Sequence, residues 1–420
     1  MDISKLNETF QNCSCQREHA CNIRAVEIGA GALEKLPVLC GGYDDIVAVF
    51  DTNTYAICGE KVEKLLNAKR VTVTILQAQE KVVIPNEEKL EEIAKKITGK
   101  TQLIIGVGSG VINDLCKKVS FDKNLPYYVI ATAPSMDGYA SVGSALILKG
   151  MKVTLNARPP LAIIADTKIL KDAPLDMIKA GYGDIIGKFS CLNDWKLSAL
   201  VNGEYLCKRI YNLTYQCAKK IKRLGYKIKN RDENAIGKLM EALVLVGVLM
   251  SFVGSSRPAS GSEHHLSHYF EITGILNKSE YFTHGIDVIY SAAFLAKLRG
   301  EMLLSTPKKR PFDKEKYEKE IQRIYTKSAE EVLKMQERLG WYHKDDSETV
   351  YKNWNKIKKV LKKAPSFSAF DKMINAVGLD YQEFERLYSK EKLDDAILYA
   401  KDLKDRYTFL WLYYVYFRKA

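Results

Sequence analysis

Four of the six histidines in this 420-residue chain lie in the segment RPASGSEHHLSHYFEITGILNKSEYFTH, which ends at His284. His264 and His268 are four residues apart, so on a helix their imidazoles share one face, with about 5–6 Å between the Cβ atoms. His284 opens a second apolar run and is expected at the N-terminus of another helix. Two or three such ligands and an open position suit a d-block metal ion that binds a substrate oxygen. The segment predicts a metal site whose remaining ligand is a carboxylate from elsewhere.

Structural histidines that cap helices and satisfy buried polar groups are the alternative explanation. A convergent set in a chain with few histidines favours the metal site. The arrangement also differs from the H-E-x-x-H motif of metalloproteases, because Glu263 precedes the pair and would not project into the site as a general base.

Strands and helices alternate in the first part of the chain. Short apolar runs lie at residues 45–51 and 71–76, in QLIIGVGSGVINDLCKKV, at 126–141 and at 161–166. This alternation predicts a parallel sheet with helices on both faces and ligands at the carboxyl ends of its strands. From Pro174 onward the pattern is helical, with a long apolar helix at 236–253 and amphipathic helices after 285. We expect an α/β domain over residues 1–170 and a helical domain over 171–420.

Gly106, Gly108 and Gly110 lie where such a sheet would place a phosphate-binding turn before a helix N-terminus. The pattern is G-x-G-x-G rather than G-x-G-x-x-G, and the acidic residue Asp51 precedes the glycines instead of following them. A dinucleotide could be held with its ribose at Asp51 and its pyrophosphate at the Gly110 turn. A glycine turn used only for tight packing is the alternative.

The composition is that of an ordinary globular protein, with 46% hydrophobic and 27% charged residues. The net charge of +13 suits anionic substrates, but nearly half of the surplus lies in residues 351–420, where cations alternate with apolar residues at helical spacing. We therefore expect no nucleic-acid partner. No apolar run approaches the roughly 20 residues of a membrane span, and the N-terminus lacks a signal-peptide pattern. A cytoplasmic protein is expected.

The nine cysteines mostly occur singly in apolar segments, as Cys116, Cys191 and Cys207 do, which indicates reduced core thiols. Cys13, Cys15 and Cys21 form the one cluster. With His19 they could bind a metal, but C-x-C-x5-C matches no standard zinc spacing. An incidental surface cluster is the favoured interpretation.

Four motifs together carry a family resemblance: GVGSGVIND, TAPSMDGYAS, AGYGDIIGK and RPASGSEHHLSH. They resemble the sn-glycerol-1-phosphate dehydrogenases of the bacterial arabinose-operon type, within the iron-type alcohol dehydrogenase and dehydroquinate synthase superfamily. The resemblance covers about residues 24–300. It implies a Rossmann-like parallel-sheet domain followed by an all-helical domain, as in dehydroquinate synthase.

The resemblance also implies roles for particular residues. Asp184, His264 and His284 would bind the metal, and Asp137, Asp184 and His268 would contact substrate and act in catalysis. The residues expected to bind the dinucleotide are Asp51, Gly110, Val111, Ile112, Asn113, Asp114, Thr132, Ala133, Pro134, Ser135 and Ser141. Two departures stand out: His265 is an extra imidazole beside the ligand, and Asn113 replaces an aliphatic residue.

The function implied is the reversible reduction of dihydroxyacetone phosphate to sn-glycerol 1-phosphate, a reaction of glycerophospholipid metabolism. Its cofactors would be NAD(H) or NADP(H) and one divalent ion, zinc or nickel, in a homodimer or larger homo-oligomer. Alternatives are a glycerol or other polyol dehydrogenase, a metal-dependent lyase on the same fold, and a basic RNA- or membrane-surface-binding protein with structural histidines.

Overall fold

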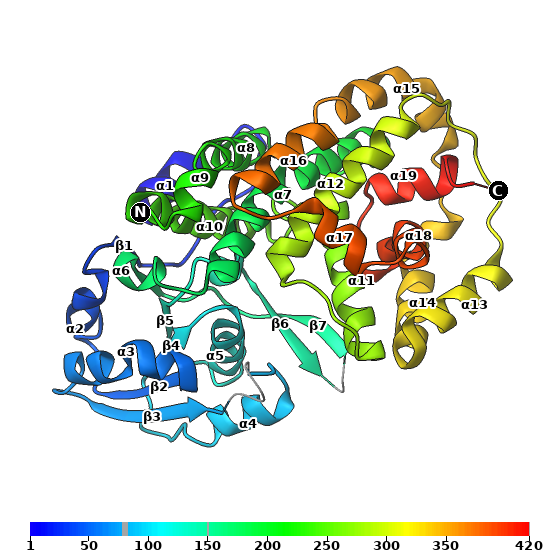
Figure 1. Ribbon diagram of the computed structural model, residues 1–420. Helices are drawn as coiled ribbons and strands as arrows, with labels where there is room; N and C mark the ends of the chain where they lie inside the picture. Colours follow the sequence, from blue (N-terminus) through cyan, green and yellow to red (C-terminus); the bar gives the residue numbers. More distant parts are fainter. Residues whose placement is uncertain (78–82, 149–150, 420) are drawn as a thin grey trace. The chain divides into compact units, whose positions relative to one another are not determined.

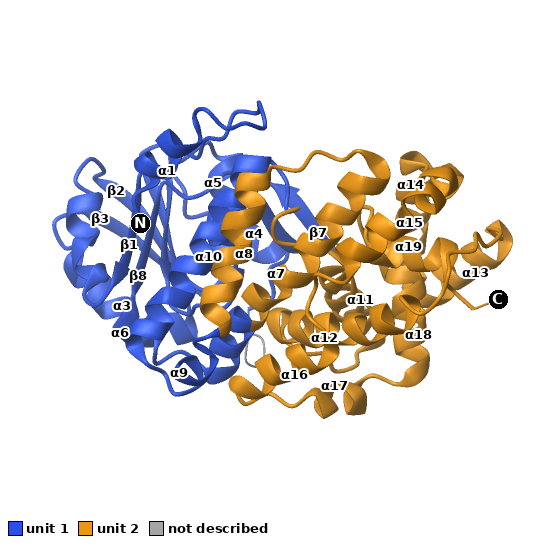
Figure 2. Cartoon of the chain, turned by 90° about the horizontal axis from the view of Figure 1, so that it is seen from above, with its two compact units in different colours: residues 1–182, 223–256 blue, residues 183–222, 257–420 orange. Residues whose placement is uncertain are grey.

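The computed structural model describes residues 1–77, 83–148 and 151–419 (Figure 1). The chain divides into two compact units, which Figure 2 colours separately. Unit 1 contains Met1–Tyr182 and Arg223–Ser256, and unit 2 contains Gly183–Lys222 and Arg257–Ala420. Each unit is thus built from two separate segments of the chain.

A six-stranded parallel sheet forms the centre of unit 1. Its order is β1 (Ala25–Gly29), β8 (Ala162–Asp166), β5 (Tyr127–Ala131), β4 (Leu103–Gly108), β2 (Asp45–Asp51) and β3 (Arg70–Leu76). β4 and β5 are buried at every residue, because strands covered on both faces bury successive side chains alike. This confirms the parallel sheet predicted from the continuous apolar runs.

Helices cover both faces of this sheet. On one face, Ile105 and Val107 pack in a core that includes Cys58 and Val62 of α3 (Thr52–Leu65). Gly106, between them on β4, points the opposite way, and a Cβ there would lie 3.1 Å from the sulfur of Cys116 in α5 (Gly110–Asp122). The other helical elements of unit 1 are α1 (Ile3–Phe10), η1 (Ala32–Lys35), α2 (Leu36–Leu39), α4 (Glu87–Ala94), η2 (Gly138–Ala140), α6 (Thr167–Leu170), α9 (Gly225–Lys229) and α10 (Glu233–Val253).

An antiparallel pair, β6 (Gly143–Leu148) and β7 (Met151–Asn156), was not predicted from the sequence. Leu146, which pairs with Val153, is fully buried, whereas its neighbours Ala145 and Ile147 are only half-buried. Alternation of this kind is the usual signal of a half-buried strand. It is a weaker signal than the unbroken apolar runs of the main sheet.

The sequence was expected to contain no apolar segment long enough to span a membrane. Helix α10 differs from this expectation, because its 21 residues are long and apolar enough to do so by length and composition. In the structure 67% of its most apolar window is buried. Its side chains Leu243, Val246 and Leu249 are fully buried, as in the core helix of a globular unit.

The regular elements of unit 2 are all helices among its described residues. Its elements are α8 (Lys208–Lys222), α11 (Ser262–Asn277), α12 (His284–Met302), α13 (Lys314–Tyr325), η3 (Thr326–Ser328), α14 (Ala329–Leu339), η4 (Trp341–His343), α15 (Ser347–Leu361), α16 (Phe367–Ala376), α17 (Tyr381–Leu387), α18 (Lys390–Tyr399), η5 (Ala400–Leu403) and α19 (Phe409–Tyr416). Helix α7 (Leu175–Asn202) begins in unit 1 and belongs to unit 2 from Gly183. The aromatic end of the chain forms α19, whose Trp411 and Tyr416 are buried.

Candidate metal and dinucleotide sites

Asp184, His264 and His284 converge within unit 2. They come from α7, α11 and the first residue of α12, and one potential ligand atom from each lies within 4.8 Å of those of the other two. Nε2 of His264 is 3.4 Å from Oδ1 of Asp184, and the rings of His264 and His284 have centroids 5.1 Å apart. One carboxylate and two imidazoles within this span fit a divalent transition-metal ion.

The neighbours of His264 fix its ring in a ligand tautomer. Its Nδ1 lies 2.7 Å from Oε1 of Glu263, a carboxylate oxygen that also accepts a hydrogen bond from the backbone N–H of Gly261 at 2.8 Å. Nδ1 therefore carries the proton, and Nε2, which faces Asp184, presents its lone pair. A carboxylate behind a metal-binding histidine has this orienting role. Burial alone would raise the pKa of Glu263, but the hydrogen bond from His264 lowers it below its usual value.

Lys188 is a part of this centre that the sequence analysis did not identify. Its ammonium donates hydrogen bonds to Oδ1 of Asp184 at 2.5 Å and to the carbonyl of Ala259 at 2.9 Å. Both charged side chains are fully buried. Burial would raise the pKa of Asp184, but the charge of Lys188 holds it far below its usual value. The signal was the four-residue spacing of Asp184 and Lys188 on one helix.

Close packing of α7 against α12 sets the separation of Asp184 from His284. A Cβ on Gly183 would lie 2.1 Å from the carbonyl oxygen of Gly285, and one on Gly187 would lie 2.4 Å from a methyl group of Val288. Any side chain at Gly183 would push the two backbones apart. The glycines of AGYGDIIGK thus allow the ligand helices to approach.

The dinucleotide candidates lie in unit 1 at the carboxyl ends of three adjacent strands. Asp51 ends β2, the first residues of α5, from Gly110 to Asp114, follow β4, and Thr132–Ser135 follow β5. From β2 the chain continues to β3 on one side, and it then returns to β4 on the other side. Reversals of this kind create the crevice in which open α/β sheets bind ligands.

Side chains in this region also have structural roles. Asp51 is the N-cap of α3: its Oδ1 accepts from the N–H of Thr54 at 2.8 Å, and the Thr54 hydroxyl accepts from the N–H of Asp51 at 2.9 Å. The carboxylate of Asp114 accepts from the N–H of Ala145 at 3.1 Å, which fixes β6 against α5. Asn113 is fully buried, and its amide donates to Asp114 at 2.9 Å.

The loop between β5 and β6 carries the remaining candidates. Buried Lys117 of α5 donates to the carbonyls of Gly138 at 2.7 Å and Gly143 at 3.1 Å, and its ammonium lies 3.4 Å from the Ser141 hydroxyl. The sequence analysis missed this lysine. It ties the segment that contains Asp137 and Ser141 to the first helix after the glycine turn.

Comparison with known proteins identifies the family. A family model described as iron-containing alcohol dehydrogenase matches residues 27–174. The glycerol-1-phosphate dehydrogenase (NAD(P)+) of Geobacillus thermodenitrificans (strain NG80-2) is 34% identical over 343 residues, covering 78% of this chain and 85% of that protein. The chain belongs to the glycerol-1-phosphate dehydrogenase family.

Two further comparisons concern a relative that covers nearly the whole chain and a solved structure. The family member of Bacillus licheniformis is 29% identical over 412 residues, which cover 97% of this chain and 92% of that protein. The crystal structure of a probable glycerol dehydrogenase from Sinorhizobium meliloti 1021 has a TM-score of 0.59, covering 91% of this chain and 89% of that one at 14% identity. The second likeness concerns the fold alone, and it confirms the predicted fold class.

Within this family member, His264 and His265 have different surroundings. His265 is fully buried, and neither ring nitrogen has a hydrogen-bond partner among the described residues. Burial, and to a smaller extent the positive charge of Arg406, lowers the pKa of His265 well below its usual value, so the ring is neutral. Adjacent residues on a helix point about 100° apart, and for this reason His265 lies outside the metal-ligand group.

His268 lies beside the metal-ligand group. Its ring centroid is 5.1 Å from that of His284 and 6.3 Å from that of His264, and its Nδ1 is 3.8 Å from a carboxylate oxygen of Glu271. The predicted substrate contacts of His268 and Asp184 therefore come from one unit. Asp137 belongs to unit 1.

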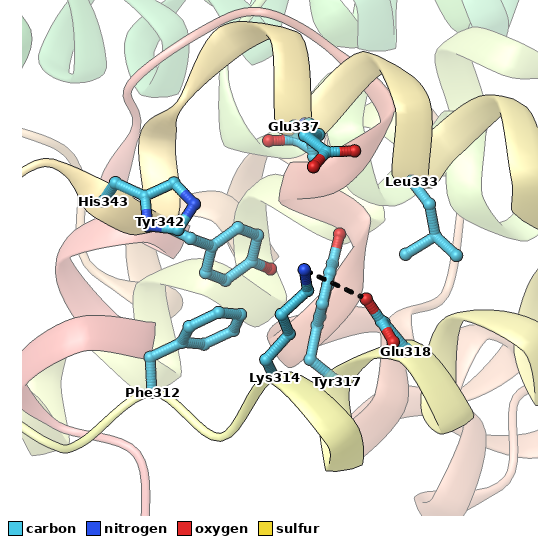
Figure 3. A pocket seen from close by; sticks show the side chains of 9 residues that line it. Phe312, Lys314, Tyr317, Glu318, Leu333, Glu337, Tyr342 and His343 are labelled. Atoms are coloured by element: carbon cyan, nitrogen blue, oxygen red, sulfur yellow. Dashed lines mark ion pairs between the residues drawn. The ribbon is translucent and has the colours of Figure 1, made fainter.

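Unit 2 also has a small hollow between α13 and α14, away from these residues (Figure 3). Phe312, Tyr317 and Tyr342 line it, and Lys314 forms an ion pair with Glu318 at 3.7 Å. Its volume is about 60 Å³, enough for a few water molecules. It contains none of the predicted site residues.

Proposed function

We propose that this family member catalyses the reversible reduction of dihydroxyacetone phosphate to sn-glycerol 1-phosphate with NADH or NADPH. The observation that carries the proposal is the convergence of Asp184, His264 and His284 in a chain that is 34% identical to a glycerol-1-phosphate dehydrogenase. The handedness of the product follows from the family.

Asp184, His264 and His284 would hold the divalent ion, with Glu263 orienting His264. When bound, the ion would polarise the substrate carbonyl as a Lewis acid, and the nicotinamide would supply the hydride. His268 and Asp137 would orient the substrate hydroxyl groups and deliver the proton that completes the new hydroxyl. Lys188 would balance the charge of Asp184.

The carboxyl edge of the sheet would bind the dinucleotide. The free N–H groups at the start of α5, from Gly110 onward, would bind the pyrophosphate. One carboxylate oxygen of Asp51 is engaged by Thr54, and the other would accept hydrogen bonds from the ribose hydroxyls. Thr132–Ser135, which follow β5, and Ser141 would complete this site.

Several finer features also belong to the proposal. The ion would be zinc or nickel, since both accept imidazole and carboxylate ligands. The protein would be cytoplasmic and would form a homodimer or a larger homo-oligomer. The two predicted domains, residues 1–170 and 171–420, would contribute the cofactor and the metal sites respectively.

The test is metal analysis of the purified protein together with oxidation of NADH and NADPH in the presence of dihydroxyacetone phosphate or dihydroxyacetone. We expect bound zinc or nickel and cofactor oxidation that depends on the phosphorylated ketone. Equal kcat/KM for the two ketones would instead indicate a polyol dehydrogenase. Turnover without a nicotinamide would indicate a lyase, and salt-sensitive RNA binding by a metal-free protein would indicate a binding module.

A further inference from the structure

A second group of metal-ligating side chains lies far along the chain from the dehydrogenase motifs, in the segment that joins α1 to β1. One potential ligand atom from each of Cys13, Cys15 and His19 lies within 4.8 Å of the others. Cys13 and His19 are buried and Cys15 is half-buried, so the group does not lie on the surface as the sequence suggested. Cys21, the third cysteine of that cluster, lies outside the group.

His19 presents one defined nitrogen to the two sulfur atoms. Its Nδ1 lies 2.9 Å from the carbonyl oxygen of Phe252 in α10. A carbonyl only accepts hydrogen bonds, so Nδ1 carries the proton and Nε2 presents a lone pair. Nε2 is 3.0 Å from the sulfur of Cys15. A backbone carbonyl that fixes the tautomer of an imidazole is the usual outer partner of a metal-binding histidine.

The ring of His19 is also held in place by its neighbours. It packs edge-on to Phe10 with ring centroids 5.4 Å apart, and it stacks on Phe252 with centroids 5.8 Å apart. Its exposed fraction is 3%. The imidazole therefore keeps one orientation, and the nitrogen that faces the sulfur atoms is fixed before any ligand binds.

The backbone of this segment brings the two cysteines together without a helix or strand. The N–H of Cys13 bonds to the carbonyl of Phe10 at 3.1 Å, and the N–H of Gln16 bonds to the carbonyl of Cys13 at 3.1 Å. The side chain of Asn7 bonds to both the N–H and the carbonyl of Cys21, at 3.2 and 3.0 Å. These hydrogen bonds hold the backbone on both sides of the two cysteines.

We propose that Cys13, Cys15 and His19 bind a structural zinc ion that fixes the connection between α1 and β1. Two thiolates and one imidazole suit zinc, with Zn–S distances of about 2.3 Å and Zn–N distances of about 2.0–2.1 Å. Ligand atoms of one tetrahedral ion then lie roughly 3.5–4 Å apart. The atoms of this group lie within 4.8 Å of one another, and the Cys15 sulfur and Nε2 of His19, which are 3.0 Å apart, would separate slightly around an ion. Water or one more protein atom would take the fourth position.

The ligand sets of the two metal centres differ in a measurable way. Asp184, His264 and His284 supply only oxygen and nitrogen, whereas this segment supplies sulfur. When cobalt(II) replaces zinc, thiolate ligands give a strong charge-transfer absorption in the near ultraviolet, and oxygen and nitrogen ligands do not. The absorption therefore reports on the second centre whether or not the proposed dehydrogenase activity is correct.

The experiment removes bound metal from the full-length protein, reloads it with cobalt(II) and records the spectrum and the metal content. We expect the thiolate absorption in the unmodified protein. Its loss, with a decrease of one ion per chain, is expected in Cys13→Ser and Cys15→Ser. Cys21→Ala is the matched control, a buried cysteine in the same segment that should keep both the absorption and the ion.

Two outcomes would overturn the proposal. One is the absence of thiolate absorption in the unmodified protein, a measurement that needs no variant to fold. The other is absorption that survives in the Cys13→Ser/Cys15→Ser double variant or disappears in Cys21→Ala. As a second readout, chelation should speed proteolytic cleavage within residues 11–24 of the unmodified protein but not of the double variant.

Discussion

The ammonium of Lys188 lies 2.5 Å from Oδ1 of Asp184, and neither side chain is exposed. In the metal-free protein the ammonium of Lys188 neutralises the buried carboxylate of Asp184. If a divalent ion binds Asp184 as proposed, the same lysine becomes a neighbouring like charge. We therefore expect Lys188 to stabilise the metal-free protein and to weaken metal binding.

Replacement of Lys188 by methionine tests both effects. The free energy of unfolding of metal-free Lys188→Met should fall by about 3–5 kcal/mol, because a buried carboxylate loses its partner. Its metal affinity should rise several-fold. Denaturant unfolding and metal titration measure these quantities. Lys196→Met, on the same helix and partly exposed, is the control; unchanged stability of metal-free Lys188→Met would contradict the pairing.

The two adjacent histidines should respond differently to substitution. Loss of a residue that only hydrogen-bonds a metal ligand typically weakens metal binding roughly 10- to 100-fold. His264→Ala and His284→Ala remove proposed ligands themselves, so each should weaken metal binding by more than this. His265→Leu should keep the ion, since its buried ring lies outside the ligand group. Metal content after gel filtration measures the difference. A metal-free His265→Leu protein that remains folded would show that the ligand is His265.

Chelation should abolish turnover without preventing dinucleotide binding. The proposed metal ligands belong to unit 2 and the dinucleotide candidates to unit 1, and the ammonium of Lys188 neutralises Asp184 when no ion is bound. NADH titration of the chelated protein should give the same Kd as the metal-loaded protein. A chelated protein that retains most of its activity would exclude the Lewis-acid role.

Asp51 should favour NADH over NADPH, because its carboxylate would accept from the 2′-hydroxyl and repel a 2′-phosphate. Asp51→Asn should shift the ratio of kcat/KM values towards NADPH while keeping the α3 cap, since asparagine is an equally good N-cap residue. Asp51→Ala should also lose about 1 kcal/mol of stability. A clear preference of the unmodified protein for NADPH would contradict this prediction.

Gly183→Ala should disturb the metal centre through the backbone. The added methyl group would lie 2.1 Å from the carbonyl oxygen of Gly285, the residue after His284. We expect a loss of about 1–3 kcal/mol in unfolding free energy and weaker metal binding. Gly300→Ala on α12 is the control: no atom lies within 4 Å of its Cβ, and it should stabilise the helix by up to about 1 kcal/mol. Equal unfolding free energies and equal metal affinities of Gly183→Ala and Gly300→Ala would rule out the close approach of Gly183 to Gly285.

Local patterns in the sequence predicted most of the elements and several residues of the candidate metal site. Unbroken apolar runs predicted the parallel strands, because a strand covered on both faces has no polar side. The four-residue spacing of His264 and His268 placed both rings on one helix face, and His284 begins its helix as expected. The pairing of β6 with β7 was missed, since its alternation is short. The apolar length of α10 was underestimated.

The tertiary structure decided what depends on residues distant in the chain. It distinguished His264 from His265, brought Asp184 to the histidines and surrounded His19 with Phe10 and Phe252. It also assembled each compact unit from two separate segments of the chain. Periodicity records which face of an element is buried, but not which distant element packs against it. That choice depends on side-chain volumes and close backbone approaches, such as Gly183 against Gly285, that exist only after the chain has folded.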